Sequence, residues 1–107
     1  MLPMLTACCA SAESLVADSA AESLATLFKA LADPARVKIV SMLLGTDEIC
    51  ACDVSTAIGK TAGTTSHHLK LLRDAGLIIG DKRGTWIYYR VVPERLAAIR
   101  DAVNPAR

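Results

Sequence analysis

The chain has 107 residues, of which 52% are hydrophobic and 21% charged, and its net charge is +1. This length suits one domain, and the balance of apolar and charged residues argues against a disordered chain. Its apolar runs fall far short of the roughly 18 residues that a membrane span needs, and its first residues lack the basic start of a secretory signal. We therefore expect a small, soluble, single-domain protein with no membrane partner.

The charges are unevenly distributed along the chain. Residues 1–59 carry seven acidic and three basic residues, whereas residues 60–90 carry six basic and two acidic ones. A basic segment within a nearly neutral chain indicates a face that meets an anionic partner. A basic face exposed only to solvent would have the same composition, so charge alone leaves both interpretations open.

The N-terminal segment differs in character from the rest of the chain. Residues 1–18 are small and polar without a clear period, which predicts a flexible arm before a folded domain at residues 19–107. The sequence Ser-Ala-Ala-Glu at 19–22 has the form of a capping box. Apolar residues then recur at helical spacing, so we expect a first helix at about residues 20–31.

Turn-forming residues bound the next two predicted helices. Asp33 followed by Pro34 indicates an N-cap and a proline in the first turn, and this second helix is expected to run to Gly45. A third, short helix fits residues 50–58, with Gly59 as its C-terminal stop.

A fourth helix is expected to begin near Thr61, whose hydroxyl can cap its N-terminus, and to include residues 64–76. Its exposed face is basic. The residues predicted to face inward are Thr65, Leu69 and Leu72, and those predicted to face outward are Ser66, His67, Lys70 and Arg73. Two short helices joined by a turn that contains glycine, the second of them basic, predict a helix-turn-helix.

The C-terminal third predicts a hairpin and a last helix. Residues 77–79 form a strand pattern, residues 81–84 a turn with Gly84 in the left-handed conformation, and residues 85–91 the returning strand. Pro93 then opens a final helix. The predicted fold is mainly α with a small β-hairpin, in the order α-α-α-α-β-β-α, and a basic hairpin after the fourth helix makes it a winged helix-turn-helix.

Four cysteines stand in two close pairs, Cys8 with Cys9 and Cys50 with Cys52. Adjacent Cα atoms are about 3.8 Å apart, too close for an unstrained disulfide, and nothing else indicates an oxidising compartment. We therefore expect reduced thiols in a cytoplasmic protein. Thiolates select thiophilic ions such as As(III), Sb(III), Cd(II), Pb(II), Zn(II) or Cu(I).

The second cysteine pair lies at the expected start of the third helix. The backbone N–H groups there are expected to lower the pKa of Cys50 and Cys52 and so favour the metal-binding thiolate. Residues two apart on a regular helix point to different sides. Both sulfurs can therefore bind one ion only if the first turn is irregular.

Several short segments in register over residues 20–103 together resemble the ArsR/SmtB family of metal-responsive repressors. They are ALADPAR at 30–36, EICACDV at 48–54, SHHLK at 66–70, LRDAGL at 72–77 and GTWIYYR at 84–90. The resemblance implies a homodimeric repressor that leaves its operator when it binds a metal or metalloid. It also implies that the first and last helices form the dimer interface.

The exposed face of the fourth helix is expected to meet base edges and phosphates of double-stranded operator DNA, and the basic wing tip an adjacent groove. The candidate DNA-contacting residues are Thr61, Gly63, Thr64, Ser66, His67 and Lys70 on the helix, and Lys82 and Arg83 on the wing. Family members often carry larger side chains at the positions of Ala62 and Gly63, which leaves the operator sequence open. His67 and His68 diverge on a helix and cannot chelate one ion together, so they are expected to contact DNA or to pack.

The candidate metal ligands are Cys8, Cys9, Cys50 and Cys52. By resemblance to relatives with N-terminal cysteines, the first pair of one subunit would join the second pair of the other. Ser55 stands where some arsenic-sensing relatives carry a third cysteine. The resemblance favours As(III) or Sb(III) as inducer, with Cd(II) or Pb(II) as the alternative, and residues 91–107 lack the histidines of the family's last-helix zinc site.

Two further readings of the cysteines remain open. They are a redox-sensing repressor and a DNA-binding regulator without a metal response. An enzyme is not expected, because the sequence has no recognisable acid–base pair, nucleophile triad or phosphate-binding loop.

Overall fold

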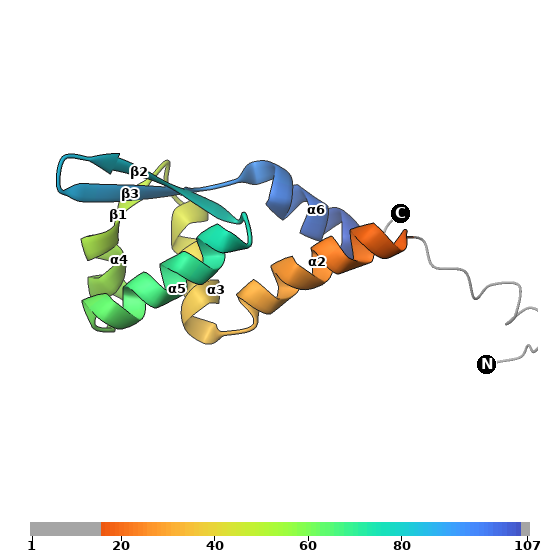
Figure 1. Ribbon diagram of the computed structural model, residues 1–107, viewed down its shortest axis with the longest axis horizontal. Coiled ribbons are helices and arrows are strands. Elements are labelled where there is room, and N and C mark those ends of the chain that lie inside the picture. The colour runs from red at the N-terminus through yellow and green to blue at the C-terminus, as the bar shows by residue number, and fades with distance from the viewer. Residues whose placement is uncertain (1–15, 106–107) are drawn as a thin grey trace, which may run out of the picture.

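A computed structural model of the chain describes residues 16–105, so most of the predicted N-terminal arm, with Cys8 and Cys9, lies outside the described residues. In chain order the described elements are α2 (Asp18–Leu31), α3 (Pro34–Leu44), β1 (Ile49–Cys50), α4 (Ala51–Ile58), α5 (Ala62–Asp74), β2 (Ile78–Arg83), β3 (Trp86–Val91) and α6 (Pro93–Val103) (Figure 1). The predicted mainly α fold with a hairpin between the fourth and last of these helices is confirmed.

The start of α2 differs from the prediction. The helix begins at Asp18, and its N-cap is Ala17, which has extended backbone angles and no side-chain capping bond. The predicted capping box at residues 19–22 is therefore wrong, because Ser19 lies inside the first turn. Alanines are strong helix formers, and the helix dipole favours Asp18 in the first turn, so the helix extends past the expected cap.

The start of α3 agrees with the prediction. The Asp33 carboxylate accepts hydrogen bonds from the backbone N–H groups of Ala35 at 2.9 Å and Arg36 at 3.3 Å, and Pro34 occupies the first turn. These bonds satisfy donors that a helix N-terminus leaves without intrahelical partners. The helix ends before Gly45, also as predicted.

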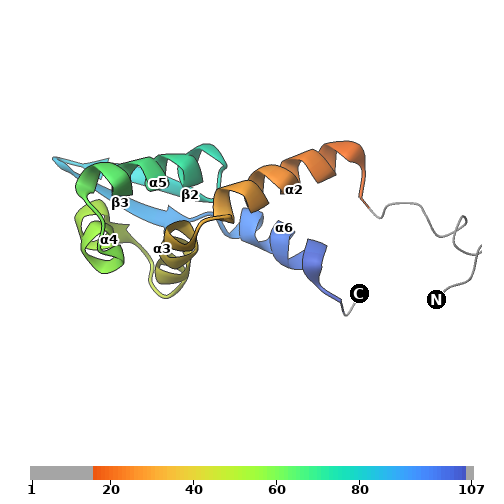
Figure 2. The ribbon, with the colours of Figure 1, turned by 90° about the horizontal axis from the view of Figure 1, so that it is seen from below.

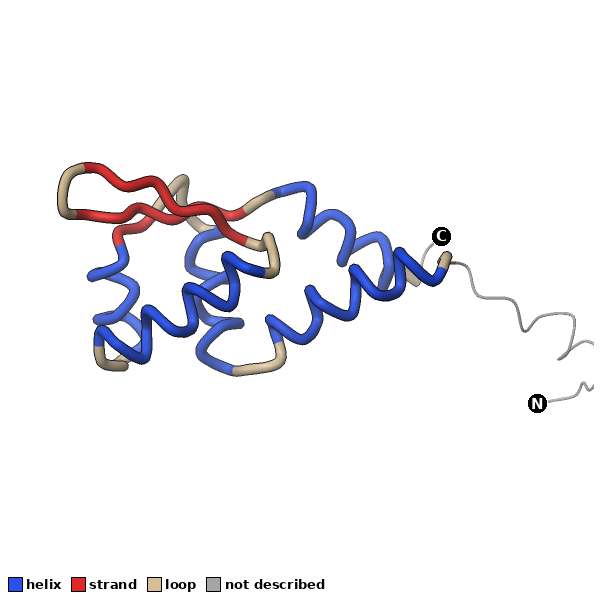
Figure 3. Tube along the Cα trace, viewed as in Figure 1, coloured by secondary structure: helices blue, strands red, loops and turns tan. Residues whose placement is uncertain are grey.

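A short strand, β1, was not predicted. Ile49 pairs with Tyr89 and Cys50 with Tyr88, so the hairpin becomes a three-stranded antiparallel sheet in the order β1-β3-β2 (Figure 3). Cys50 was expected to open the third helix, but it has extended angles and is the N-cap of α4. Without β1, this edge of β3 would present unpaired backbone groups.

The wing is a longer hairpin than predicted. The strand β2 continues to Arg83, which pairs with Trp86, so the turn consists of Gly84 and Thr85 rather than residues 81–84. The predicted left-handed conformation of Gly84 is confirmed by its φ of +65°.

The hydrophobic core joins α3, α4, α5 and the sheet. Its fully buried residues include Ile39, Leu43, Val54, Leu69, Leu72, Leu77 and Ile78. The helices α2 and α6 contact each other and lie side by side, extending away from this body (Figures 1 and 2). The fold thus places α5 and the wing at one end of the molecule and the α2–α6 pair at the other.

Candidate nucleic-acid interface and metal site

The N-terminus of α5 is fixed by the predicted Thr61 cap. The Thr61 hydroxyl oxygen accepts a hydrogen bond from the backbone N–H of Thr64 at 3.2 Å, and the hydroxyl donates to Thr64 Oγ1 at 3.1 Å. Gly63 lies in the first turn with open space around its Cα. This end of the helix therefore presents small, exposed side chains and backbone groups.

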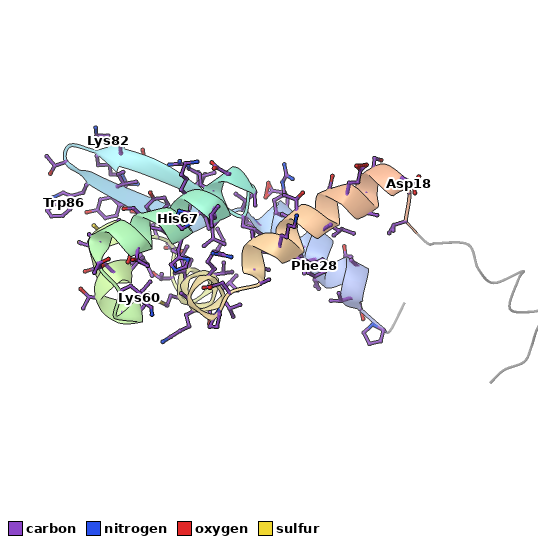
Figure 4. The ribbon with its side chains drawn as sticks, turned by 60° about the horizontal axis from the view of Figure 1, so that its bottom comes forward. Asp18, Phe28, Lys60, His67, Lys82 and Trp86 are labelled. Carbon is purple, nitrogen blue, oxygen red and sulfur yellow. The ribbon has the colours of Figure 1, made fainter. Side chains whose placement is uncertain are left out.

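The predicted faces of α5 are confirmed by burial. Thr65, Leu69 and Leu72 are buried, whereas the candidate DNA-contacting side chains of this helix are exposed. Figure 4 shows His67 on α5, Lys60 near the turn that precedes it, and Lys82 and Trp86 at the tip of the wing. The helix is thus anchored by its apolar face and presents a polar face to solvent.

The turn between α4 and α5 is closed by backbone and side-chain contacts. Gly59 has a left-handed φ of +68°, and its N–H donates to the Ser55 carbonyl at 3.1 Å. The Ser55 hydroxyl donates to the Lys60 carbonyl at 2.7 Å. Ser55, which stands at the third-cysteine position of the resemblance, therefore uses its hydroxyl to hold the helix-turn-helix angle.

The two histidines of α5 occupy different environments. His67 is exposed, whereas the His68 side chain is largely buried, and its Nδ1 lies 3.2 Å from Arg36 Nη1 and 3.9 Å from Asp33 Oδ2. Arg36 Nε in turn donates to the Ala30 carbonyl at 2.6 Å. His68 thus connects α5 to the junction of α2 and α3, which is one of the two roles expected for it.

Two of the candidate DNA-contacting cations have intramolecular partners. Lys70 Nζ lies 2.7 Å from Asp74 Oδ2, and this hydrogen bond is the main cause that lowers the pKa of Asp74. Arg83 forms a two-pronged ion pair with Glu48, at 2.5 and 2.8 Å, and its Nε donates to Asp81 at 3.0 Å. These pairs are exposed, so DNA phosphates can compete for the same cations.

Sequence reasoning missed several residues that line these sites. Lys38 and Lys60 flank a hollow between α3 and the start of α5, beside Thr64 and His68. Glu48 is 35 residues from Arg83 in the chain, and no short-range pattern connects them. The basic segment 60–90 includes Lys60, whereas Lys38 lies in the acidic segment 1–59 and had no sequence indication.

Cys50 and Cys52 come together at the start of α4. Both are free thiols, Cys50 is buried and Cys52 exposed, and their sulfurs lie 3.0 Å apart. From the sequence, the two sulfurs were expected to meet only if the first turn of the helix were irregular. The structure meets that requirement because Cys50 precedes the helix in extended conformation.

The pKa of Cys52 differs from the expectation. It is raised, first by the hydrogen bond with Cys50, then by burial and by the negative charges of Cys50 and Asp53. The expected lowering by the helix N-terminus is therefore wrong for this thiol. The hydrogen bond and the neighbouring carboxylate both favour the protonated form.

The described residues offer two sulfur ligands for one ion. Within residues 16–105, no group of three or more His, Cys, Asp or Glu side chains is placed to hold a metal ion. Two thiolates on a tetrahedral zinc, with bonds of about 2.3 Å, stand about 3.8 Å apart, so the pair fits a thiophilic ion after a small opening. Cys8 and Cys9 lie outside the described residues.

The fold and its exposed face define a class of protein. The helices α4 and α5, joined at Gly59, are followed by a hairpin with a basic tip, and together these are a winged helix-turn-helix DNA-binding domain. Residues 33–79 match the family described as "Bacterial regulatory protein, arsR family". The chain belongs to this family.

Relatives of known name and a solved structure agree with this assignment. The chain is 45% identical over 67 residues to the arsenical resistance operon repressor of Escherichia coli, a match that covers 63% of this chain and 57% of that repressor. It is 40% identical over 78 residues to the cadmium resistance transcriptional regulatory protein CadC of Listeria innocua, covering 73% and 66% of the two chains. The matches thus span little more than half to two thirds of the length of these two relatives.

A solved structure extends the similarity to the whole fold. The homodimeric winged helix-turn-helix domain of a possible ArsR-family regulator from Mycobacterium bovis superposes with a TM-score of 0.70 at 29% identity, covering 87% of this chain and 85% of that one. No helix among the described residues has both the length and the apolar character needed to cross a membrane.

Proposed function

We propose that this protein is a homodimeric transcriptional repressor that binds operator DNA without inducer and is released when As(III) binds its cysteine thiolates. Sb(III), which has the same thiol chemistry, is proposed as a second inducer. The observation that carries the proposal is the 3.0 Å approach of the Cys50 and Cys52 sulfurs at the start of α4, the helix that precedes the recognition helix. The role is regulatory rather than enzymatic, and it is exercised in the cytoplasm.

The proposed inducer site has more than two ligands. As(III) takes three thiolates, and the pair on α4 supplies two of them. We assign the remaining ligand to Cys8 or Cys9, reaching from the arm of the partner subunit. The hydroxyl of Ser55 already donates to the Lys60 carbonyl, which supports a third ligand from outside α4.

The proposed DNA interface consists of the N-terminal half of α5 and the wing. It includes Thr61, Gly63, Thr64, Ser66, His67, Lys70, Lys82 and Arg83. Their common exposure on the side of the molecule away from the core supports this assignment. A dimer would present two such helices about 34 Å apart, which suits a palindromic operator.

Homodimerisation is supported by the apolar surface of α2 and α6. Leu24 and Leu27 of α2 and Ala98 and Ala102 of α6 line a shared apolar groove. Phe28 of α2 is 42% exposed and Val103 of α6 is 60% exposed, so both helices carry exposed large apolar side chains. The related domain from Mycobacterium bovis is described as homodimeric.

The proposed release mechanism follows from the position of Cys50. Cys50 directly precedes α4 in the chain, and it pairs with Tyr88 in strand β3 of the wing. An ion that draws the two sulfurs to its own bond geometry therefore pulls on both DNA-contacting parts. Release requires that the ion favours a dimer whose helices no longer match successive grooves, with coupling of about 1–3 kcal/mol or more.

A Cd(II)- or Pb(II)-responsive repressor is the alternative. It is favoured by the similarity to the cadmium resistance regulator, and these ions accept three or four thiolates. Redox sensing, or DNA binding without any metal response, would leave the fold unchanged and is distinguished by the same experiment.

The test is a titration of the reduced, full-length protein bound to a fluorescent duplex of its own promoter, followed by anisotropy. Arsenite is expected to release the DNA at low stoichiometry, with cadmium weaker. Cys52→Ser is expected to bind DNA normally and to lose release, whereas Ala57→Ser, at an exposed position of the same helix, is expected to keep it. Preferential release by cadmium would select the alternative inducer. DNA binding indifferent to both ions would refute the metal switch.

A further inference from the structure

The charge of Arg83 is directed away from the tip of the wing. Arg83 is the last residue of β2, beside the Gly84 turn, yet its guanidinium lies 4.8 Å from the centroid of the Tyr88 ring and reaches Glu48 in the segment before β1. We infer that Glu48 is a positioning residue that competes with DNA phosphate for Arg83 and so links the thiol site to the wing. The competition rests on the proposed DNA interface, in which Arg83 contacts phosphate, and the link to the inducer rests in addition on the proposed thiol switch.

The contacts of Arg83 use most of its hydrogen-bonding capacity. Nη1 and Nη2 donate to the two carboxylate oxygens of Glu48, and Nε donates to Asp81. A guanidinium recognises phosphate through the same fork of N–H groups that it uses for a carboxylate. Arg83 therefore binds either Glu48 or a phosphate through this fork, and each contact excludes the other.

Two of the three groups that contact the guanidinium, Glu48 and Tyr88, are connected to the segment that carries Cys50. Glu48 is two residues before Cys50, and the strand β1 begins at the residue between them. Tyr88, whose ring lies under the guanidinium, is the residue that pairs with Cys50 in the sheet. A shift of Cys50 on binding an ion therefore moves two of the three groups that hold Arg83.

Asp81 provides a matched comparison. It also contacts Arg83, through Nε, and it pairs with Tyr88 from the other side. Unlike Glu48, Asp81 lies in strand β2 of the wing, and β3 stands between β2 and the strand that contains Cys50. Neutralising Asp81 changes the charge beside Arg83 without altering the thiol segment.

The first experiment measures DNA affinity in the absence of any inducer. Full-length Glu48→Gln is expected to bind its promoter duplex about two- to fivefold more tightly per protomer, as expected for the loss of one competing surface ion pair. Its salt dependence is expected to steepen by about one counterion per released arginine. In an Arg83→Gln background, the same Glu48→Gln change is expected to have almost no effect.

This double-mutant cycle separates competition from general electrostatics. If Glu48→Gln strengthens DNA binding equally with and without Arg83, the effect is only the loss of a negative charge near DNA, and the inference is wrong. Unchanged affinity of Glu48→Gln in the native background would also overturn it. Neither result bears on the thiol site.

The second experiment measures the factor by which arsenite weakens DNA binding. Glu48→Gln is expected to reduce this factor several-fold, whereas Asp81→Asn is expected to tighten DNA binding and leave the factor unchanged. Equal factors in the native protein and Glu48→Gln would refute the link to the inducer while the competition stands. If the native protein itself shows no release, the proposed function fails, and the first experiment still decides the competition.

Discussion

Gly59 and Gly63 allow a matched test of the helix-turn-helix geometry, because the same change to alanine is expected to alter stability in opposite directions. Gly59 ends α4 with a left-handed φ of +68°, whereas Gly63 lies in the first turn of α5. At both positions an added Cβ meets no atom within 4 Å. The expected difference between the two variants is therefore a difference in backbone conformation.

The magnitude follows from known backbone preferences. An L-residue in the left-handed helical region costs about 1–2 kcal/mol, partly offset by about 0.4–1 kcal/mol because alanine restricts the unfolded chain. Gly59→Ala is thus expected to lower the free energy of unfolding by about 1 kcal/mol. Gly63→Ala is expected to raise it by about 0.5–1 kcal/mol, since alanine is favoured over glycine within a helix.

The assay is urea and thermal denaturation of both variants, followed by circular dichroism. All samples need the same protein concentration, because the apparent stability of a dimer depends on it. A change of about 1 kcal/mol corresponds to roughly 4–8 °C in Tm for a domain of this size. Shifts of the same sign in the two variants, or a neutral Gly59→Ala, would refute the left-handed turn.

Two further predictions concern the histidines and the thiols. His68→Ala is expected to lower the free energy of unfolding by about 1–3 kcal/mol, because it removes the ring nitrogen that pairs with Arg36 Nη1 in a partly buried site. Exposed His67→Ala is expected to stay within about 0.5 kcal/mol of the native protein, and equal effects of the two changes on urea unfolding would contradict this. Cd(II) affinity is expected to fall as pH is lowered, by about tenfold per pH unit for each thiol proton displaced, since the pKa of Cys52 is raised and the thiol is protonated near neutrality. Arsenous acid loses its hydroxyls as water, which carry away the thiol protons, so calorimetric titration is expected to show a flat profile over the same range. A cadmium profile that is also flat would show that the thiols are already ionised.

Local patterns predicted the elements whose causes lie within a few residues. Asp33 and Pro34 fixed the start of α3 through bonds to the next turn, and the burial of Leu69 and Leu72 followed from helical periodicity. The same approach failed at α2, where Ser19 had the right spacing for a cap. A capping residue ends a helix only if its neighbours do not favour further helix, and the high helix propensity of the alanines here extends α2 past Ser19.

Features that depend on distant partners could not be predicted. The strand β1 has two residues, too few for any alternation, and it exists because Tyr88 and Tyr89 arrive beside it from 38 to 40 positions later. The Glu48–Arg83 pair is similarly remote in sequence. The sequence therefore predicted both cysteines as ligands but could not decide whether their sulfurs converge.

The backbone conformation of Cys50 decides two properties of the candidate switch: the approach of the two sulfurs and the pairing of the thiol segment with the wing. Its extended angles, with φ of −68° and ψ of 143°, bring its sulfur to that of Cys52 rather than to another side of α4. The same angles let it pair with Tyr88, so the proposed metal ligand is also a strand residue of the sheet that forms the wing. If Cys50 were helical, its sulfur would point away from that of Cys52, and Cys50 would also lose its pairing with Tyr88 of the wing. The proposed ion site and the proposed DNA-contacting wing are thus connected through the main-chain pairing of β1 with β3, which side-chain substitutions at Cys50 or Cys52 leave in place.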